Sequence, residues 1–283
     1  MKRQTEAPPR IYIGIDFSGS AEQWKAGKRN SNVWIATAAA DGERRLVLKR
    51  LVRVQELPGT GDPLTRLTGF LQSEPFAAAA IDAPFSVPRE YVPEGRHALL
   101  LDQVAALRAA GRPFARGQDV VDCLLPEDAP RNKKYWRCTE EQWRKRVNVR
   151  STLWNGPRGG AAFTAACLTL LHRAGIPVWP WAGPEAKCLA EAFPAAQLSW
   201  WGLPCVGYSD PKEDAACVRA GILKGLKRQG LRFTKGLESK MLESADALDA
   251  AVCVFAAKAV RESRLVSPPE ADWETEGWIA VHR

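Results

Sequence analysis

The sequence has few of the residues that bind zinc. It contains three histidines, and none of its seven cysteines forms a CxxC pair with another. Zinc sites need such ligands at close, regular spacing, so this pattern excludes a zinc module. An odd number of cysteines without paired spacing is typical of a reducing compartment, and we therefore expect a cytoplasmic protein.

Long apolar runs and nucleotide-binding glycine motifs are also missing. No apolar stretch reaches the ~18 residues that a membrane-spanning helix needs, so we expect no membrane partner. The polar start MKRQTEAPPR has no apolar core after its basic residues, which argues against a secretory signal. We expect residues 1–9 to form a disordered lead-in. GIDFSGS, at 14–20, lacks the GxGxxG spacing of dinucleotide-binding turns.

Apolar periodicity predicts one α/β domain over residues 10–283. Alternating apolar residues predict strands, and apolar positions at helical spacing predict helices, one starting after the capping Asp62 and one closed by Gly175. Asp41-Gly42 is typical of a hairpin turn. We expect strands at 10–18, 31–40, 44–57 and 76–82, shorter strands at 176–181 and 186–196, an edge strand at 276–283, and helices at 62–74, 96–110, 139–147, 159–175, 210–230 and 243–260.

The order of these elements, β-β-β-α-β-α-β-α, is not the regular alternation of a doubly wound dinucleotide fold. It resembles the ribonuclease H-like fold, a mixed sheet flanked by helices. In that fold the first strand lies centrally, beside the fourth. Asp16 on the first strand and Asp82 at the end of the fourth are therefore expected to be neighbours. The last long helix is expected to cross the same edge of the sheet.

That last helix, within ESADALDAAVCVFAAKAV at 243–260, is apolar on all sides except for two acids near its start. Asp246 and Asp249 are three positions apart and so share a helix face. Acids are favoured in a first turn, where Ser244 can act as the N-cap, and this explains Asp246 as well as a functional role does. Asp249 lies one turn in, where a cap does not explain it. Buried carboxylates are normally paired, protonated or bound to a metal.

Positive charge is concentrated in one segment. The chain has a net charge of +8, and residues 131–158 contain nine basic and two acidic residues. Aromatic residues interleaved with these charges suit a phosphate backbone with bases to stack on. The other interpretation is a solvated basic insertion, over 112–157, that its tryptophans anchor to the body. The candidate nucleic-acid contacts are Lys133, Lys134, Trp136, Arg144, Lys145, Arg146 and Arg150.

Five motifs occur in order along the chain: GIDFSG at 14–19, IDAPFSVP at 81–88, AEAFPAA at 190–196, SADALDAAVCVFAA at 244–257 and EGWI at 276–279. Together they resemble the predicted-nuclease family catalogued as domain of unknown function 429, a branch of the ribonuclease H-like superfamily. The resemblance implies metal ligands at Asp16, Asp82 and one or both of Asp246 and Asp249. It also marks Glu191, as a ligand or as a structural partner of the ligands.

We therefore expect a nuclease whose catalytic residues are Asp16, Asp82 and Asp249. Oxygen-only ligands suit Mg²⁺ or Mn²⁺, and a pair of such ions can activate water and stabilise the leaving oxygen of a phosphodiester. The substrate, DNA or RNA, stays open, and no segment indicates an oligomeric state. One alternative is a nucleic-acid-binding protein without catalysis. Another is an actin-like or sugar-kinase-type ATP-binding protein, because DFSGS resembles the first phosphate loop of those proteins, although a second glycine-rich loop is missing.

Overall fold

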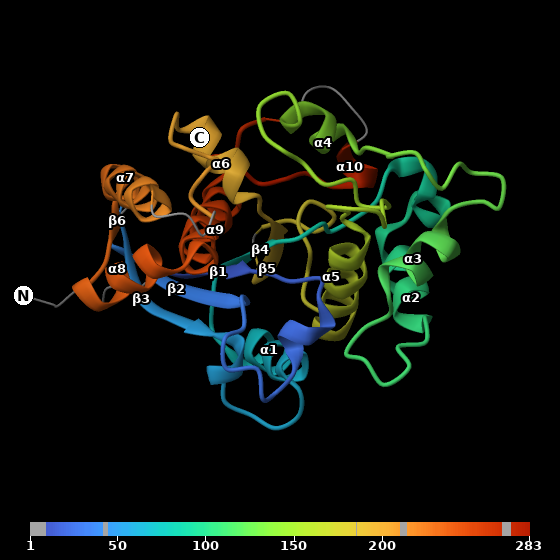
Figure 1. Ribbon diagram of the computed structural model, residues 1–283, viewed down its shortest axis with the longest axis horizontal. Helices are drawn as coiled ribbons and strands as arrows, with labels where there is room; N and C mark the ends of the chain where they lie inside the picture. Colours follow the sequence, from blue (N-terminus) through green and yellow to red (C-terminus); the bar gives the residue numbers. More distant parts are fainter. Residues whose placement is uncertain (1–9, 42–44, 185, 210–213, 268–272) are drawn as a thin grey trace, which may run out of the picture.

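A six-stranded mixed sheet forms the centre of the molecule (Figure 1). The structure is a computed structural model that describes residues 10–41, 45–184, 186–209, 214–267 and 273–283. The lead-in predicted for 1–9 and the tip of the hairpin predicted at Gly42 lie outside these residues. In the order β5-β4-β1-β2-β3-β6, the strands are β5 (Cys188–Glu191), β4 (Ala78–Asp82), β1 (Ile11–Asp16), β2 (Trp34–Asp41), β3 (Arg45–Arg53) and β6 (Leu231–Arg232).

Helices cover both faces of this sheet. On one face, α1 (Pro63–Ser73), α2 (His97–Ala106), α3 (Gly117–Leu124) and α5 (Ala161–Ala174) share one apolar core with the sheet. On the other face a second core contains residues of α6 (Pro194–Trp200), α7 (Asp214–Arg228), α8 (Lys235–Glu243) and α9 (Ala245–Glu262). The remaining α-helices of the described residues are α4 (Cys138–Trp143) and α10 (Trp273–Glu276). The expected mixed α/β sheet flanked by helices is confirmed. Within the described ranges, no helix has the length and apolar character needed to cross a membrane.

Local signals place the helix ends as the sequence predicts. The Asp62 side chain accepts a hydrogen bond from the backbone N–H of Thr65 at 2.9 Å and caps α1. Gly175, with φ of 59°, ends α5 in the left-handed conformation that glycine adopts without strain. The Ser244 hydroxyl accepts from the Ala247 N–H at 3.2 Å, and so α9 starts at the predicted cap.

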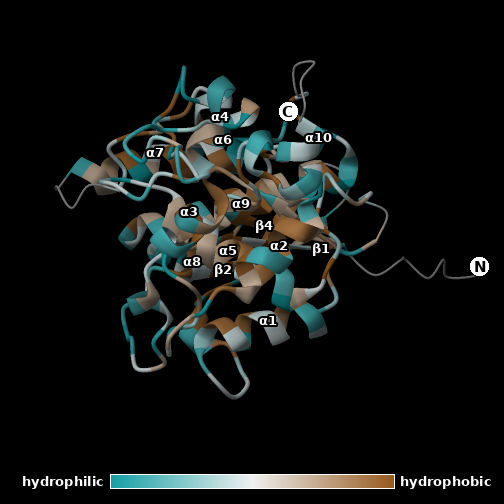
Figure 2. Ribbon diagram, turned by 90° about the vertical axis from the view of Figure 1, so that its right-hand side faces the viewer, coloured by the Kyte–Doolittle hydropathy of each residue, from teal (hydrophilic) through white to brown (hydrophobic). Residues whose placement is uncertain are grey.

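The central strand β1 and the helix α9 are in unusually close contact. Side chains alternate along a strand, so Ile13 and Ile15 enter one core while the alternate positions of β1 face α9. Gly14 is one of those positions. A Cβ atom placed there would collide with the carbonyl oxygen of Ala250 and lie 2.6 Å from the backbone nitrogen of Val254. The apolar centre in which α9 and β4 lie is visible in Figure 2. This contact brings the start of α9 to the end of β1.

The three shorter strands predicted from the sequence differ from what the structure contains. The segment 176–181 makes a single bridge, Val178 to Leu189, because Pro177 and Pro180 lack the N–H groups that a ladder needs. The strand expected over 186–196 is confined to β5, and Pro194 begins α6. The C-terminal segment forms no edge strand. It makes one bridge, Leu265 to His282.

The basic insertion predicted over 112–157 is folded onto the body of the domain. It contains α3 and α4, and Phe114, Val120 and Leu153 are buried in the same core as α5. Trp143 and Val147 are buried in a third, smaller core together with Ala196 of α6. The insertion therefore holds a fixed position beside the end of β5.

Candidate carboxylate site

Asp16 and Asp82 are the last residues of two adjacent parallel strands, β1 and β4. They are paired with each other in the strand register, and both follow the alternation that faces α9. Asp16 is 7% exposed. The sequence prediction that the first and fourth strands are neighbours, with these two acids side by side, agrees with the observed pairing.

The first two turns of α9 bring two more carboxylates to the same place. Asp246 and Asp249 line one cleft together with Asp16 and Asp82. The cleft has a volume of about 300 Å³, and the four acids come from three different elements of the fold. Asp249 also accepts a hydrogen bond of 2.9 Å from the hydroxyl of Tyr208, a residue that is 6% exposed.

The four carboxylates are close enough to change one another's ionisation. Burial raises the pKa of Asp16 well above its usual range, and the charges of Asp249, Asp246 and Asp82 raise it further. Burial raises the pKa of Asp82 to about 7, an increase that the charge of Arg150 limits. Protonation of these two aspartates is therefore easier than that of an exposed aspartate, whereas a bound cation would favour their charged form.

Asp249 and Asp246 differ in their surroundings. Burial raises the pKa of Asp249 well above its usual range, the charge of Asp82 adds to the increase, and the hydrogen bond from Tyr208 opposes it. Burial also raises the pKa of Asp246, but the charge of Arg53 acts in the opposite direction. Asp249 is therefore more strongly linked to the strand acids than Asp246 is.

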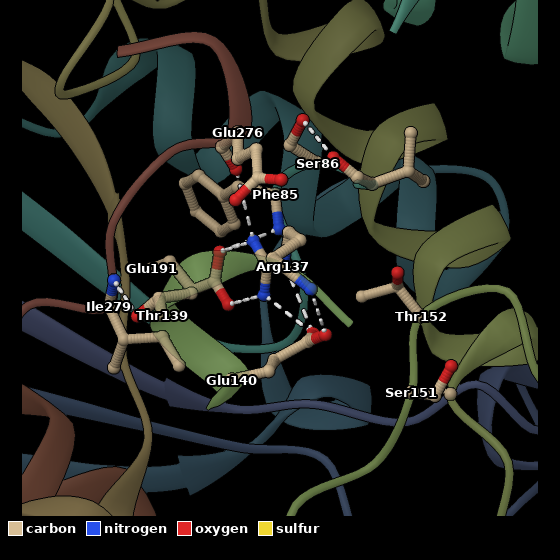
Figure 3. A network of polar contacts seen from close by, with 12 residues as sticks. Phe85, Ser86, Arg137, Thr139, Glu140, Ser151, Thr152, Glu191, Glu276 and Ile279 are labelled. Carbon is tan, nitrogen blue, oxygen red and sulfur yellow. Dashed lines mark hydrogen bonds and ion pairs between the residues drawn. The ribbon is translucent and has the colours of Figure 1, made fainter. Parts of the chain in front are cut away.

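Glu191 ends β5 opposite Ile81, the residue before Asp82, but its oxygens are occupied by other partners (Figure 3). The guanidinium of Arg137 donates to both of them, at 2.7 Å and 2.5 Å, and the backbone N–H of Phe85 donates to one at 3.0 Å. Arg137 also donates to Glu140 at 3.1 Å. The Arg137 and Glu191 side chains are 1% and 4% exposed. A residue of the insertion thus neutralises Glu191, which is held as a structural partner of the site.

Glu276 extends this buried network to the C-terminal segment. Its carboxylate accepts from the backbone N–H groups of Arg89, at 3.0 Å, and Cys138, at 2.5 Å. Its carbonyl oxygen accepts from Arg137 at 3.4 Å. The insertion, the strand end and the C-terminal segment are therefore joined beside the cleft, which Arg137, Glu140 and Glu191 also line.

A family model described as "Protein of unknown function (DUF429)" matches residues 14–273. The chain belongs to this family. No curated protein and no solved structure matches the chain at a significant level. The family match covers the motifs at 14–19, 81–88, 190–196 and 244–257 that contain the candidate acids.

The residue types of this DUF429 site fit a hard divalent cation, because every candidate ligand is a carboxylate. Among the described residues, however, no three or more His, Cys, Asp or Glu side chains are grouped so as to hold a metal ion. The four aspartates therefore line one cleft but do not form a grouped metal-binding site among the described residues.

The basic residues predicted to contact nucleic acid divide into two groups in this DUF429 chain. Arg150 lines the cleft with the four aspartates, and its guanidinium lies 5.0 Å from the ring centre of Phe163, another cleft residue. The others lie outside the cleft. Those with exposed side chains are Lys133, Lys134, Arg144, Lys145 and Arg146, whereas Trp136 is half-buried.

Sequence reasoning missed several residues of the site, among them Arg137, Tyr208 and Asn32. Arg137 lies within the charge run, where nothing separates a buried arginine from its exposed neighbours except Glu140 three positions later. Tyr208 stands in a stretch without periodicity, and Asn32, which also lines the cleft, precedes a strand. Only the capping pattern of Arg137 and Glu140 carried a signal, because an acid at the third helical position is typical of a helix start.

Proposed function

We propose that the protein is a metal-dependent nuclease with a ribonuclease H-like fold. The observation that carries the proposal is the convergence of Asp16, Asp82, Asp246 and Asp249, from β1, β4 and α9, on one cleft. The parallel pairing of β1 with β4 beside an antiparallel β1–β2–β3 meander supports the fold assignment.

In this proposal the aspartates hold Mg²⁺ or Mn²⁺, which supplies positive charge to the phosphate and makes water more acidic. Because these carboxylates are not grouped as a metal site among the described residues, their side chains would have to rotate toward one another to hold the ion. Asp16 and Asp82, fixed by the sheet, would form the constant part of the site. Tyr208 orients Asp249 by donating a hydrogen bond to one oxygen of its carboxylate.

Arg150 has the position of a phosphate-binding residue in this mechanism. It lies in the cleft wall, and its charge acts on Asp82, so both groups face the same space. A guanidinium can donate two hydrogen bonds to phosphate oxygens. It would hold the phosphodiester against the carboxylates and balance part of their negative charge.

The test is cleavage of labelled single-stranded, duplex and branched DNA and RNA by purified protein in Mg²⁺ or Mn²⁺. We expect Asp16→Asn and Asp249→Asn to reduce the rate by at least about 100-fold, because they remove charge at the reacting centre. Asp122→Asn, which changes an exposed carboxylate on α3, is the matched control. Cleavage that Asp16→Asn leaves unchanged would assign the activity to another protein or another site.

A second candidate function is nucleic-acid binding without catalysis. The absence of a grouped metal site among the described residues favours it, because buried aspartates that hold protons need no ion. In that case binding would depend strongly on salt, and Mg²⁺ would leave the melting temperature unchanged. No nucleic acid would be cleaved under any of the conditions above.

A further inference from the structure

Three tryptophans, two of the insertion and one of α6, are partly exposed and have cations beside their rings. Trp136 and Trp154 of the insertion are half-buried, and Trp200 of α6 is 37% exposed. The other aromatic residues of the basic segment, Tyr135 and Trp143, are 8% and 2% exposed and belong to the core. The aromatic residues of this segment therefore divide into anchors and accessible rings.

Two of the accessible rings, Trp136 and Trp154, share one cation. The Lys134 ammonium lies 6.0 Å from the ring centre of Trp136 and 6.0 Å from that of Trp154. The Arg144 guanidinium lies 5.5 Å from the Trp136 ring. Within the described part of the chain, Lys134 forms no ion pair with an acid, so its positive charge is available to an anionic partner.

Trp154 is held in place by the loop that follows it. Its indole N–H donates to the carbonyl oxygen of Pro157 at 3.2 Å. A Cβ atom at Gly156 would collide with the Trp154 ring, so only glycine permits this packing. The loop then continues through Gly160 into the cleft wall. A fixed ring that keeps an accessible part of its surface is suited to stacking, because little conformational entropy is lost when a base binds.

On the other side, the insertion meets α6 through a similar contact. The Arg146 guanidinium lies 5.9 Å from the ring centre of Trp200. Residues 148–150, which follow in the chain, line the cleft. The cations and rings are thus continuous in sequence with the walls of the carboxylate cleft.

We propose that this surface, which we call the cation–aromatic surface and define as Lys134, Trp136, Arg144, Arg146, Trp154 and Trp200, binds an unpaired nucleic-acid strand. The proposal rests on the nuclease function and specifies its substrate class. Cations alone would be sufficient to bind a duplex, because the bases of a duplex already stack on each other. Accessible rings add binding free energy only where bases are free to stack on them.

The position of the aspartates agrees with a single strand. Asp16 is 7% exposed in a cleft of about 300 Å³, so the reacting phosphodiester must enter the cleft. A flexible strand can bend one phosphate inward while its neighbouring bases rest on the rings outside. A base-paired helix is stiff and presents its phosphates along a regular surface.

The experiment measures the binding of short labelled oligonucleotides, single-stranded and duplex, DNA and RNA, by fluorescence anisotropy in EDTA. Without metal ions no cleavage interferes. We expect Trp136→Ala and Trp154→Ala each to weaken binding of the single strand by about 5-fold or more, with less than about 2-fold change for the duplex. Trp136→Phe keeps a ring and should retain most of the affinity.

Charge variants separate stacking from attraction. Lys134→Ala should weaken binding of single strand and duplex alike and reduce the salt dependence. The matched control is Arg232→Ala on β6, at the opposite edge of the sheet from β5. Melting temperatures establish that each variant is folded.

Equal losses for single strand and duplex in the tryptophan variants, or no loss in either, would overturn the proposal. The result is independent of the nuclease test. Duplex cleavage that depends on Asp16, without any preference for single strands, removes this inference and leaves the nuclease. Ring-dependent binding of single strands without cleavage removes the nuclease and leaves the surface.

Discussion

Asp16 and Asp82 are in-register neighbours across the parallel strands β1 and β4. Adjacent strands lie about 4.8 Å apart, so two carboxylates on the same face of the sheet are held near each other by backbone hydrogen bonds alone. Neither strand can move away without breaking the central ladder. The repulsion between the two acids is therefore built into the fold, and a proton or a cation must relieve it.

The first prediction concerns stability and pH. The folded-state pKa of Asp82 is about 7, well above the value of an unfolded chain. The unfolded chain releases this proton above about pH 4, whereas the folded protein keeps it up to about pH 7. The free energy of unfolding therefore falls as the pH rises from about 4 to about 7. Asp82→Asn removes this loss. In EDTA at about pH 8 we expect the variant to be more stable by about 1–3 kcal/mol, measured by urea unfolding.

The same variant provides its own control. At about pH 4 the wild-type carboxyl already holds its proton, so the two proteins should unfold at nearly equal urea concentrations. A stability gain that is constant between the two pH values would mean that Asp82 does not titrate as its surroundings indicate.

A second prediction concerns the divalent cation. Mn²⁺ at 100 times its dissociation constant should add about 2.7 kcal/mol to the free energy of unfolding. The increase should be larger at about pH 8 than at about pH 6, because protons compete for Asp82 below its pKa. Asp249→Asn should abolish most of the increase, whereas Asp122→Asn should preserve it. Equal shifts in all three proteins would indicate ion binding elsewhere.

The central sheet was predictable because its signals are local. The alternation around Gly14 and the run ending at Asp82 identify strands, and Asp62, Gly175 and Ser244 mark helix ends through hydrogen bonds within a few residues. The candidate acids stood out because a carboxylate is costly in an apolar segment. These features depend only on residues that are close in the sequence, so they can be recognised in a single sequence.

The partners of Glu191 were not predictable, because they are distant in the sequence. Arg137 reaches Glu191 across 54 positions, and Glu276 joins Cys138 across 138. A buried arginine has the same appearance in a charge run as an exposed one. The short strand expected at 176–181 failed for a local reason, since its two prolines outweigh its apolar character.

The third prediction tests this buried network. Arg137→Met leaves the carboxylates of Glu191 and Glu140 buried without their partner, and we expect a loss of about 3–5 kcal/mol in the free energy of unfolding. Arg144→Met is the matched control. Arg144 also pairs with an acid three residues away, Glu141 at 2.5 Å, but that pair is exposed and should contribute less than about 1 kcal/mol.

Adding Glu191→Gln and Glu140→Gln to Arg137→Met should recover part of this loss, because no buried charge then remains unpaired. A loss of similar size in the Arg137 and Arg144 single variants would show that the network contributes no more than a surface ion pair does.

The last prediction concerns the contact that brings α9 to β1. Gly14→Ala introduces a methyl group against the backbone of Ala250 and Val254, which cannot rotate away. Overpacking of a core typically costs about 1–3 kcal/mol, and we expect a loss at or above the upper end of that range. Because Asp246 and Asp249 move with α9, stabilisation by Mn²⁺ should fall as well.

Gly69→Ala is the control: Gly69 is an exposed position of α1 with no atom within 4 Å of the added Cβ, so alanine should stabilise that helix by about 0.5–1 kcal/mol. If Gly14→Ala retained full stability and full Mn²⁺ response, the close packing of α9 on β1 would not be what positions the acids.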